Sequence, residues 1–95
     1  MPAAGSRPTN PASDSWFVYI VQCKDQSLYT GIAKNLVKRL QAHNHGRDGA
    51  KYTRARRPVR LVYLEMFSSR SAAAKREYAL KQLRRVEKLR LIARG

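Results

Sequence analysis

The sequence predicts one α+β domain, in which a small, mostly antiparallel three-stranded sheet is flanked by helices in the order β-β-α-β-α-α. Two runs rich in β-branched and aromatic residues, 16–23 and 28–32, are separated by a turn and indicate a hairpin. A third such run, 59–67, follows a segment with helical spacing, and two further helical sets end the chain. A length of 95 residues favours a single domain.

The first strand is apolar on both faces. Side chains alternate along a strand, so one face carries Phe17, Tyr19 and Val21, and the other carries Val18 and Ile20. We therefore expect this strand to be central or covered on both sides. The polar residues 24–27 supply the turn.

The first helix is predicted to begin after Asn35, whose side-chain oxygen can cap it. Leu36 and Leu40 lie one turn apart and should face the core, and Gly46 is a suitable C-terminal stop. The sequence from Arg47 to Pro58 is typical of a basic loop.

The C-terminal third is predicted to be helical, beginning after Ser69 or Ser71 as the cap. Two apolar sets with helical spacing follow one another, and the second starts at Val86. A break near Arg84 and Arg85 stays open, because no Gly, Pro or good capping residue marks the joint.

Charge is the strongest compositional signal. The chain has 20 Lys and Arg against 6 Asp and Glu, a net charge of +14, and residues 1–15 contribute none of the excess. Such a domain attracts polyanions, so nucleic acid is the leading partner, and a ribosome or an anionic membrane surface are alternatives. No apolar run approaches the roughly 20 residues needed to cross a bilayer, so no membrane insertion is expected.

Residues 1–15 are rich in Pro, Ser and Ala, which predicts a disordered tail before a domain at 16–95. This stretch lacks the apolar segment of a secretory signal. Cys23 is the only cysteine, so no intrachain disulfide can form. We expect a cytoplasmic protein.

Two short motifs and three separated polar residues carry a resemblance to a known family. The motifs are Val18-Tyr19-Ile20 and Tyr29-Thr30-Gly31, and the polar residues are Arg39, His43 and Glu77. Together they resemble the GIY-YIG nucleases over roughly residues 16–83, and the overall shape is similar to the short bacterial members.

The chain departs from the family pattern at three places. Phe17-Val18-Tyr19 stands where Gly-Ile-Tyr is common, and Thr30 replaces an aliphatic residue. No Asn follows Glu77, so the catalytic set is expected to be a reduced one.

The resemblance implies that Glu77 binds one divalent cation, Mg²⁺ or Mn²⁺, because carboxylates are natural ligands for these ions. The alternative is an ordinary surface pair with Lys81, one turn later on the helix. Arg39 would hold the scissile phosphate, since its guanidinium matches two phosphate oxygens.

The resemblance also implies that a tyrosine activates water, and we favour Tyr19 slightly over Tyr29. A phenol is a weak base unless cations lower its pKa, and Arg39 and the metal are expected to do so. His43 would relay a proton with a pKa close to neutral, or simply contact phosphate. Gly31 would let the backbone pass close beside the tyrosines. Core packing is the alternative role for both tyrosines.

A basic stretch with one interleaved aromatic residue is predicted to bind the nucleic-acid backbone, as positive grooves with stacking platforms do. An unspecialised solvated loop is the alternative reading of this stretch. The predicted nucleic-acid-binding residues are Lys34, Lys51, Tyr52, Arg54, Arg56 and Arg57.

These features predict a metal-dependent endonuclease that hydrolyses DNA phosphodiester bonds, with single-stranded or branched DNA preferred and little sequence specificity. One alternative is a non-catalytic DNA- or RNA-binding module on the same fold. Another is a nuclease that is active only when bound to a larger protein partner. The sequence does not indicate an oligomeric state.

Overall fold

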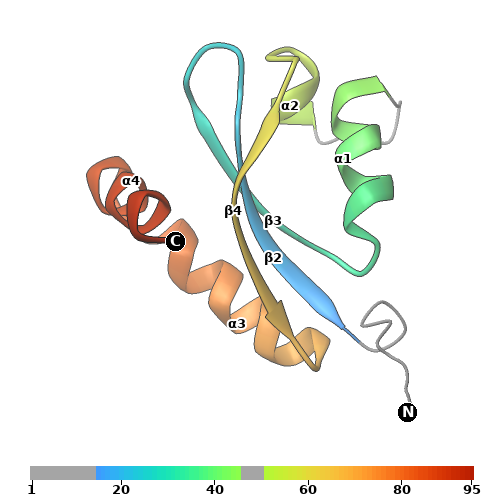
Figure 1. Ribbon diagram of the computed structural model, residues 1–95, viewed down its shortest axis with the longest axis vertical. Coiled ribbons are helices and arrows are strands. Elements are labelled where there is room, and N and C mark those ends of the chain that lie inside the picture. The colour runs from blue at the N-terminus through green and yellow to red at the C-terminus, as the bar shows by residue number, and fades with distance from the viewer. Residues whose placement is uncertain (1–14, 46–50) are drawn as a thin grey trace.

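A computed structural model describes residues 15–45 and 51–95 of the chain. Its centre is a sheet of the strands β2 (Trp16–Gln22), β3 (Leu28–Ala33) and β4 (Arg60–Phe67), in the order β3-β2-β4. Both strand pairs are antiparallel. The predicted fold class and element order are confirmed (Figure 1).

The central strand β2 separates two hydrophobic clusters, as its doubly apolar pattern predicted. Tyr19 and Val21 belong to one cluster, and Val18 and Ile20 belong to the other. Helix α1 packs on the first cluster through Leu36 and Leu40, while the C-terminal helices cover the second. The sheet therefore has a buried core on each face.

Helix α1 (Leu36–His45) begins as predicted, because the Asn35 side chain accepts a hydrogen bond of 3.0 Å from the Lys38 amide. The predicted stop at Gly46 lies outside the described residues. The prediction of an unbroken loop is wrong for 51–54, which form the short helix α2 (Lys51–Arg54). Four polar residues are too few to give a periodic signal, so this helix depends on tertiary contacts.

Two helices end the chain, α3 (Arg70–Lys81) and α4 (Arg85–Arg94). Ser69 is the cap of α3, accepting a hydrogen bond of 3.1 Å from the Ala72 amide. The C-terminal helical region does break near Arg84 and Arg85, because residues 82–84 form a joint outside both helices. The sequence feature that marks this joint is Glu87. Its carboxylate accepts a hydrogen bond of 2.8 Å from the Arg84 amide, a donor that has no partner within helix α4.

The predicted tail, residues 1–15, lies outside the described residues except for Ser15 and stays a prediction. Across residues 15–45 and 51–95, no helix has the length and apolar character needed to cross a membrane.

Candidate active site

The two motif tyrosines lie on neighbouring strands and on the same face of the sheet. Tyr19 on β2 is paired with Gly31 on β3, two residues after Tyr29. The Tyr19 ring lies directly over Gly31, where a Cβ atom would stand only 2.5 Å from the phenol oxygen. Any larger residue at 31 would therefore displace Tyr19, which supports the expected close approach.

His43, on α1, is completely buried between the tyrosines. Its Nε2 lies 2.7 Å from the Tyr19 hydroxyl, and its Nδ1 lies 2.8 Å from the hydroxyl of Thr53 on α2. The imidazole meets the rings of Tyr19 and Tyr29 edge-on, with centroid distances of 5.7 and 5.3 Å. Strands β2 and β3 and helix α2 thus hold the imidazole of His43 in one orientation.

Arg39 lies one turn before His43 on α1 and completes the cluster. Its guanidinium is within hydrogen-bonding reach of the phenol oxygens of both Tyr19 and Tyr29. Beside it opens a pocket of about 380 Å³ that Lys34 and Lys38 also line. Four of the five predicted catalytic residues are therefore together, next to an open and positively charged pocket.

The pKa of Tyr19 is raised, so Arg39 alone does not produce the predicted lowering. Burial is the largest cause, and the hydrogen bond and charge of Arg39 act against it without overcoming it. The negative charges of Tyr29 and Glu77 add smaller upward contributions. A cation lowers the pKa of Tyr19, as expected, but desolvation outweighs it.

The prediction of a near-neutral pKa for His43 is wrong. Burial, reinforced by the positive charges of Arg39 and Arg57, lowers the pKa of His43 from 6.5 to about 4. The imidazole is therefore neutral at physiological pH and carries a single N–H. It serves as one donor and one acceptor between Tyr19 and Thr53.

Glu77 lies on α3, where its carboxylate forms a 3.2 Å ion pair with Lys81, the alternative considered from the sequence. Within the described parts of the chain, no three His, Cys, Asp or Glu side chains are grouped as a metal cluster. A single carboxylate nevertheless suits Mg²⁺, which usually takes one or two and keeps several waters. The donor set therefore fits a lightly coordinated cation and not a structural metal.

The neighbour of Glu77 fixes how α3 meets the sheet. Arg76 donates two hydrogen bonds of 3.0 Å to Glu65 on β4, and Tyr63 donates a third to the same carboxylate. This half-buried network holds α3 in register, so the direction in which Glu77 points is set by β4.

Comparison with known proteins agrees with this geometry. The GIY-YIG catalytic domain family matches residues 15–90. The chain belongs to the GIY-YIG family. A UPF0213 protein of Staphylococcus saprophyticus is 57% identical over 82 residues, covering 86% of this chain and 99% of that protein. A UPF0213 protein of Staphylococcus aureus is 60% identical over 79 residues, covering 83% and 95%.

A solved relative shares the architecture. The solution structure of a UPF0213 protein from Bacillus halodurans matches with a TM-score of 0.55 and 42% identity, covering 83% of each chain. The family is one of nucleases, so the chain has the fold and the family of a phosphodiester-cleaving enzyme.

One departure from the GIY-YIG pattern does not touch the site. Thr30 is paired with Ile20 and is buried on the opposite face of the sheet from Tyr29. Its hydroxyl has no hydrogen-bond partner among the described residues. The substitution therefore concerns the core under α3 and leaves the tyrosines unchanged.

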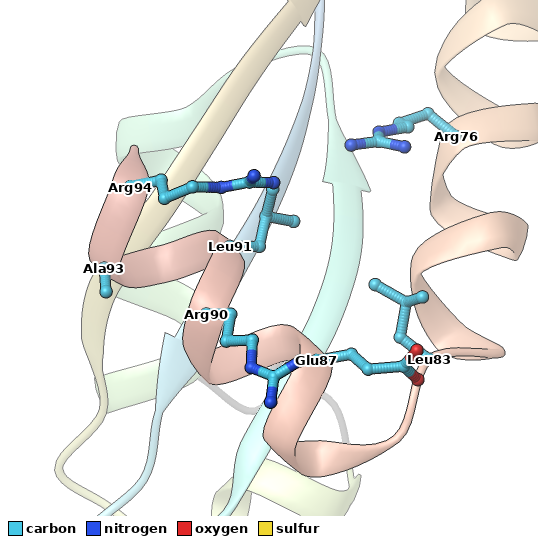
Figure 2. Close-up of a pocket in the computed structure, with 7 residues that line it drawn as sticks. All are labelled: Arg76, Leu83, Glu87, Arg90, Leu91, Ala93 and Arg94. Atoms are coloured by element: carbon cyan, nitrogen blue, oxygen red, sulfur yellow. The ribbon is translucent and has the colours of Figure 1, made fainter.

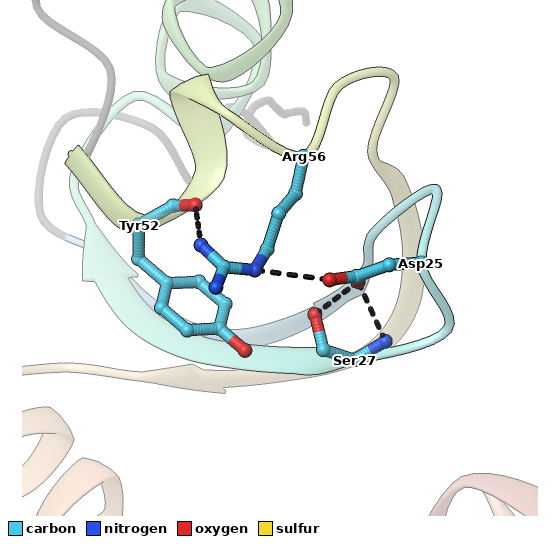
Figure 3. Close-up of polar contacts among 4 residues, drawn as sticks. All are labelled: Asp25, Ser27, Tyr52 and Arg56. Atoms are coloured by element: carbon cyan, nitrogen blue, oxygen red, sulfur yellow. Dashed lines mark hydrogen bonds and ion pairs between the residues drawn. The ribbon is translucent and has the colours of Figure 1, made fainter.

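The ring of Tyr52, which was predicted to stack on a nucleobase, already has Tyr29 and Arg56 as neighbours. Its ring stacks on Tyr29 at 6.0 Å, and the guanidinium of Arg56 lies 4.0 Å from the ring centroid. Arg56 also donates hydrogen bonds to the Tyr52 carbonyl and to Asp25 (Figure 3). A stacked nucleobase would have to meet the guanidinium plane of Arg56 or displace it.

The other predicted DNA contacts have different surroundings. Arg57 donates hydrogen bonds to the carbonyls of Ala42 and His43, which caps the end of α1. Lys34 is exposed and lies 6.0 Å from the Trp16 ring, and Arg54 is exposed on α2. Lys51 begins α2, but its side chain lies outside the described residues. Their DNA contacts stay predictions.

The sequence missed two residues of this region. Lys38 lines the pocket beside Arg39, and spacing along α1 could have identified it. Thr53 gave no signal, because a buried threonine ten residues from its partner histidine has no pattern in sequence.

Proposed function

We propose that this protein is a metal-dependent endonuclease that hydrolyses DNA phosphodiester bonds, acting on single-stranded or branched DNA with little sequence specificity. The observation that carries the proposal is the Arg39 guanidinium, which reaches both motif tyrosines beside a pocket lined by two lysines. A core-packing role for the tyrosines would not require a cation at their hydroxyls.

In the proposed reaction, Arg39 binds the scissile phosphate and stabilises the charge that develops on it. The guanidinium is half-buried, so its charge is less screened than that of a fully exposed arginine. Removing a preorganised donor of this kind commonly lowers the rate by about 10²–10³.

Tyr19 accepts a proton from the attacking water while its own proton passes to Nε2 of His43. The 2.7 Å separation allows this transfer without movement of either ring. A phosphate bound at Arg39 partly neutralises one of the charges that lower the pKa of His43, so substrate binding makes the transfer easier. After the attack, His43 returns its proton to Tyr19 as Tyr19 releases its own proton to solvent, and the leaving oxygen takes up a proton from solvent.

Glu77 is the proposed ligand of one Mg²⁺ or Mn²⁺. The cation would supply Lewis-acid stabilisation of the phosphate and of the leaving oxygen. Glu77 is 22% exposed and its carboxylate already has a cationic neighbour in Lys81, with which the metal would share it.

The proposed substrate follows from the surface of the site. The lysine and arginine side chains of the site are suited to phosphate oxygens and not to the edges of bases, so binding depends on the DNA backbone and not on the DNA sequence. The flexible backbone of a single strand or flap fits an open pocket of about 380 Å³ more easily than a rigid duplex.

The test compares two charge-matched variants, Glu77→Gln and Glu87→Gln. Each removes one carboxylate from a helix, but Glu87 lies on the next helix, α4, where it pairs with Arg84. Labelled single-stranded, flapped and duplex DNA are incubated with Mg²⁺, Mn²⁺ or EDTA. We expect metal-dependent cutting of single strands and flaps by the wild type and Glu87→Gln, and a loss of about 10²-fold or more for Glu77→Gln.

Other outcomes separate the alternatives. Cutting that survives Glu77→Gln would show that the proposed metal ligand is wrong, and equal cutting of intact duplex would overturn the substrate preference. Tight, salt-sensitive binding without cutting would favour a binding module. Cutting that occurs only after a larger partner protein is added would favour a partner-dependent nuclease.

A further inference from the structure

We propose that Thr53 is a positioning residue that keeps the His43 proton on Nδ1 and so leaves Nε2 free to accept the Tyr19 proton. This inference rests on the proposed function for its catalytic meaning, but its structural content can be tested without any cleavage. It assigns a role within the fold to α2, a segment that the sequence predicted to be a nucleic-acid-binding loop.

Thr53 and His43 form a fully buried pair. Both side chains are 0% exposed, and the Thr53 hydroxyl lies 2.8 Å from Nδ1. A buried N–H without an acceptor is strongly unfavourable, so the ring must place its single proton where an acceptor exists.

Arg39 biases which nitrogen carries that proton. A guanidinium only donates, so beside the Tyr19 oxygen it competes with an Nε2–H for that acceptor. The Tyr19 proton then has Nε2, at 2.7 Å, as its acceptor. A neutral ring that accepts at Nε2 must carry its proton at Nδ1, where the Thr53 oxygen accepts it.

The charged surroundings favour the neutral ring on which this argument depends. His43 faces Tyr19 from β2, Tyr29 from β3, Arg39 from its own helix and Arg57 from the segment after α2. None of these is a carboxylate that would stabilise an imidazolium. Burial acts in the same direction.

The position of Thr53 is itself fixed on both sides. The Arg56 amide donates to the Thr53 carbonyl at 3.0 Å, and Arg56 joins α2 to the β2–β3 turn through Asp25 at 3.0 Å. Tyr52, the preceding residue, stacks on Tyr29. Helix α2 therefore connects the histidine, a tyrosine and the hairpin turn.

The first measurement is the His43 tautomer, read from the nitrogen chemical shifts of the imidazole in ¹⁵N-labelled protein. We expect a protonated Nδ1 and an unprotonated Nε2 in the wild type and in Thr53→Ser, which keeps the hydroxyl. Thr53→Val, which has nearly the same shape without the hydroxyl, should move the proton to Nε2. A wild-type ring protonated at Nε2, or a Thr53→Val ring still protonated at Nδ1, overturns the proposal.

The second measurement is the cleavage rate of the same three proteins. We expect kcat to fall about 10- to 100-fold in Thr53→Val with little change in KM, and Thr53→Ser to restore it. An equal loss in both variants would indicate a packing role and contradict the proposal. If the wild type cuts no DNA, the proposed nuclease function fails, while the tautomer measurement still decides the role of Thr53.

Discussion

At the scale of single residues, burial controls the chemistry of His43 more strongly than its partners do. The ring is neutral in the folded protein, whereas it is exposed and protonates near pH 6.5 in the unfolded chain. The unfolded state therefore binds more protons below that pH, so the free energy of unfolding should fall as pH decreases from 6.5 toward about 4.

This predicts a loss of about 2 kcal/mol between about pH 7 and about pH 5, a window above the titration of most carboxylates. Urea unfolding followed by circular dichroism at the two pH values measures it. His43→Gln is the control, because a side chain that does not titrate should remove most of the difference. A wild-type stability that stays constant over this window would show that His43 is protonated in the fold.

The residue scale also shows what sequence could and could not reveal. The grouping of Tyr19, Tyr29, Arg39 and His43 was predictable, because motif spacing on a hairpin and a helix brings them to one place. Their pKa directions were not predictable, since these depend on how much solvent each ring loses in the assembled core. Thr53 was missed because its contact with His43 arises only when α1 and α2 pack together in the tertiary structure.

At the scale of elements, helix α1 carries Arg39 and His43, and its start is fixed by Asn35. Replacing Asn35 with Ala removes the acceptor of the Lys38 amide, which should lower the free energy of unfolding by about 1 kcal/mol. Chemical denaturation measures this loss, and Asn35→Ser, which keeps a capping oxygen, should recover most of it. Equal stability of Asn35→Ala and the wild type would mean that the cap contributes nothing to α1.

The strands and long helices were predictable because each buries at least one apolar face, which leaves a pattern in the sequence. The joint between α3 and α4 was not, since Arg84, the residue that precedes α4, is a poor cap and the stabilising group is the Glu87 carboxylate three residues later. Helix α2 has no apolar face of its own. It is held by Thr53, Tyr52 and Arg56, each through a partner from another element.

At the scale of the whole molecule, the net charge of +14 raises the question of which face meets DNA. One basic region surrounds Arg39, with Lys34 and Lys38. A second pocket of about 590 Å³ lies between α3 and α4 and is lined by Arg76, Arg90 and Arg94 (Figure 2). These regions belong to opposite faces of the sheet, because α1 and α4 pack on different core clusters.

The salt dependence of binding distinguishes the two faces. Each phosphate contact on a single strand contributes about 0.7 to the slope of log K against log salt, through release of counterions. We expect Lys34→Ala and Lys38→Ala each to reduce the slope by about that amount, measured by fluorescence anisotropy with a labelled oligonucleotide. Arg90→Ala and Arg94→Ala remove the same charge from the α4 side and should leave the slope nearly unchanged. An equal reduction from both pairs would mean that the strand contacts both faces, and the region around Arg39 would then be only part of the binding surface.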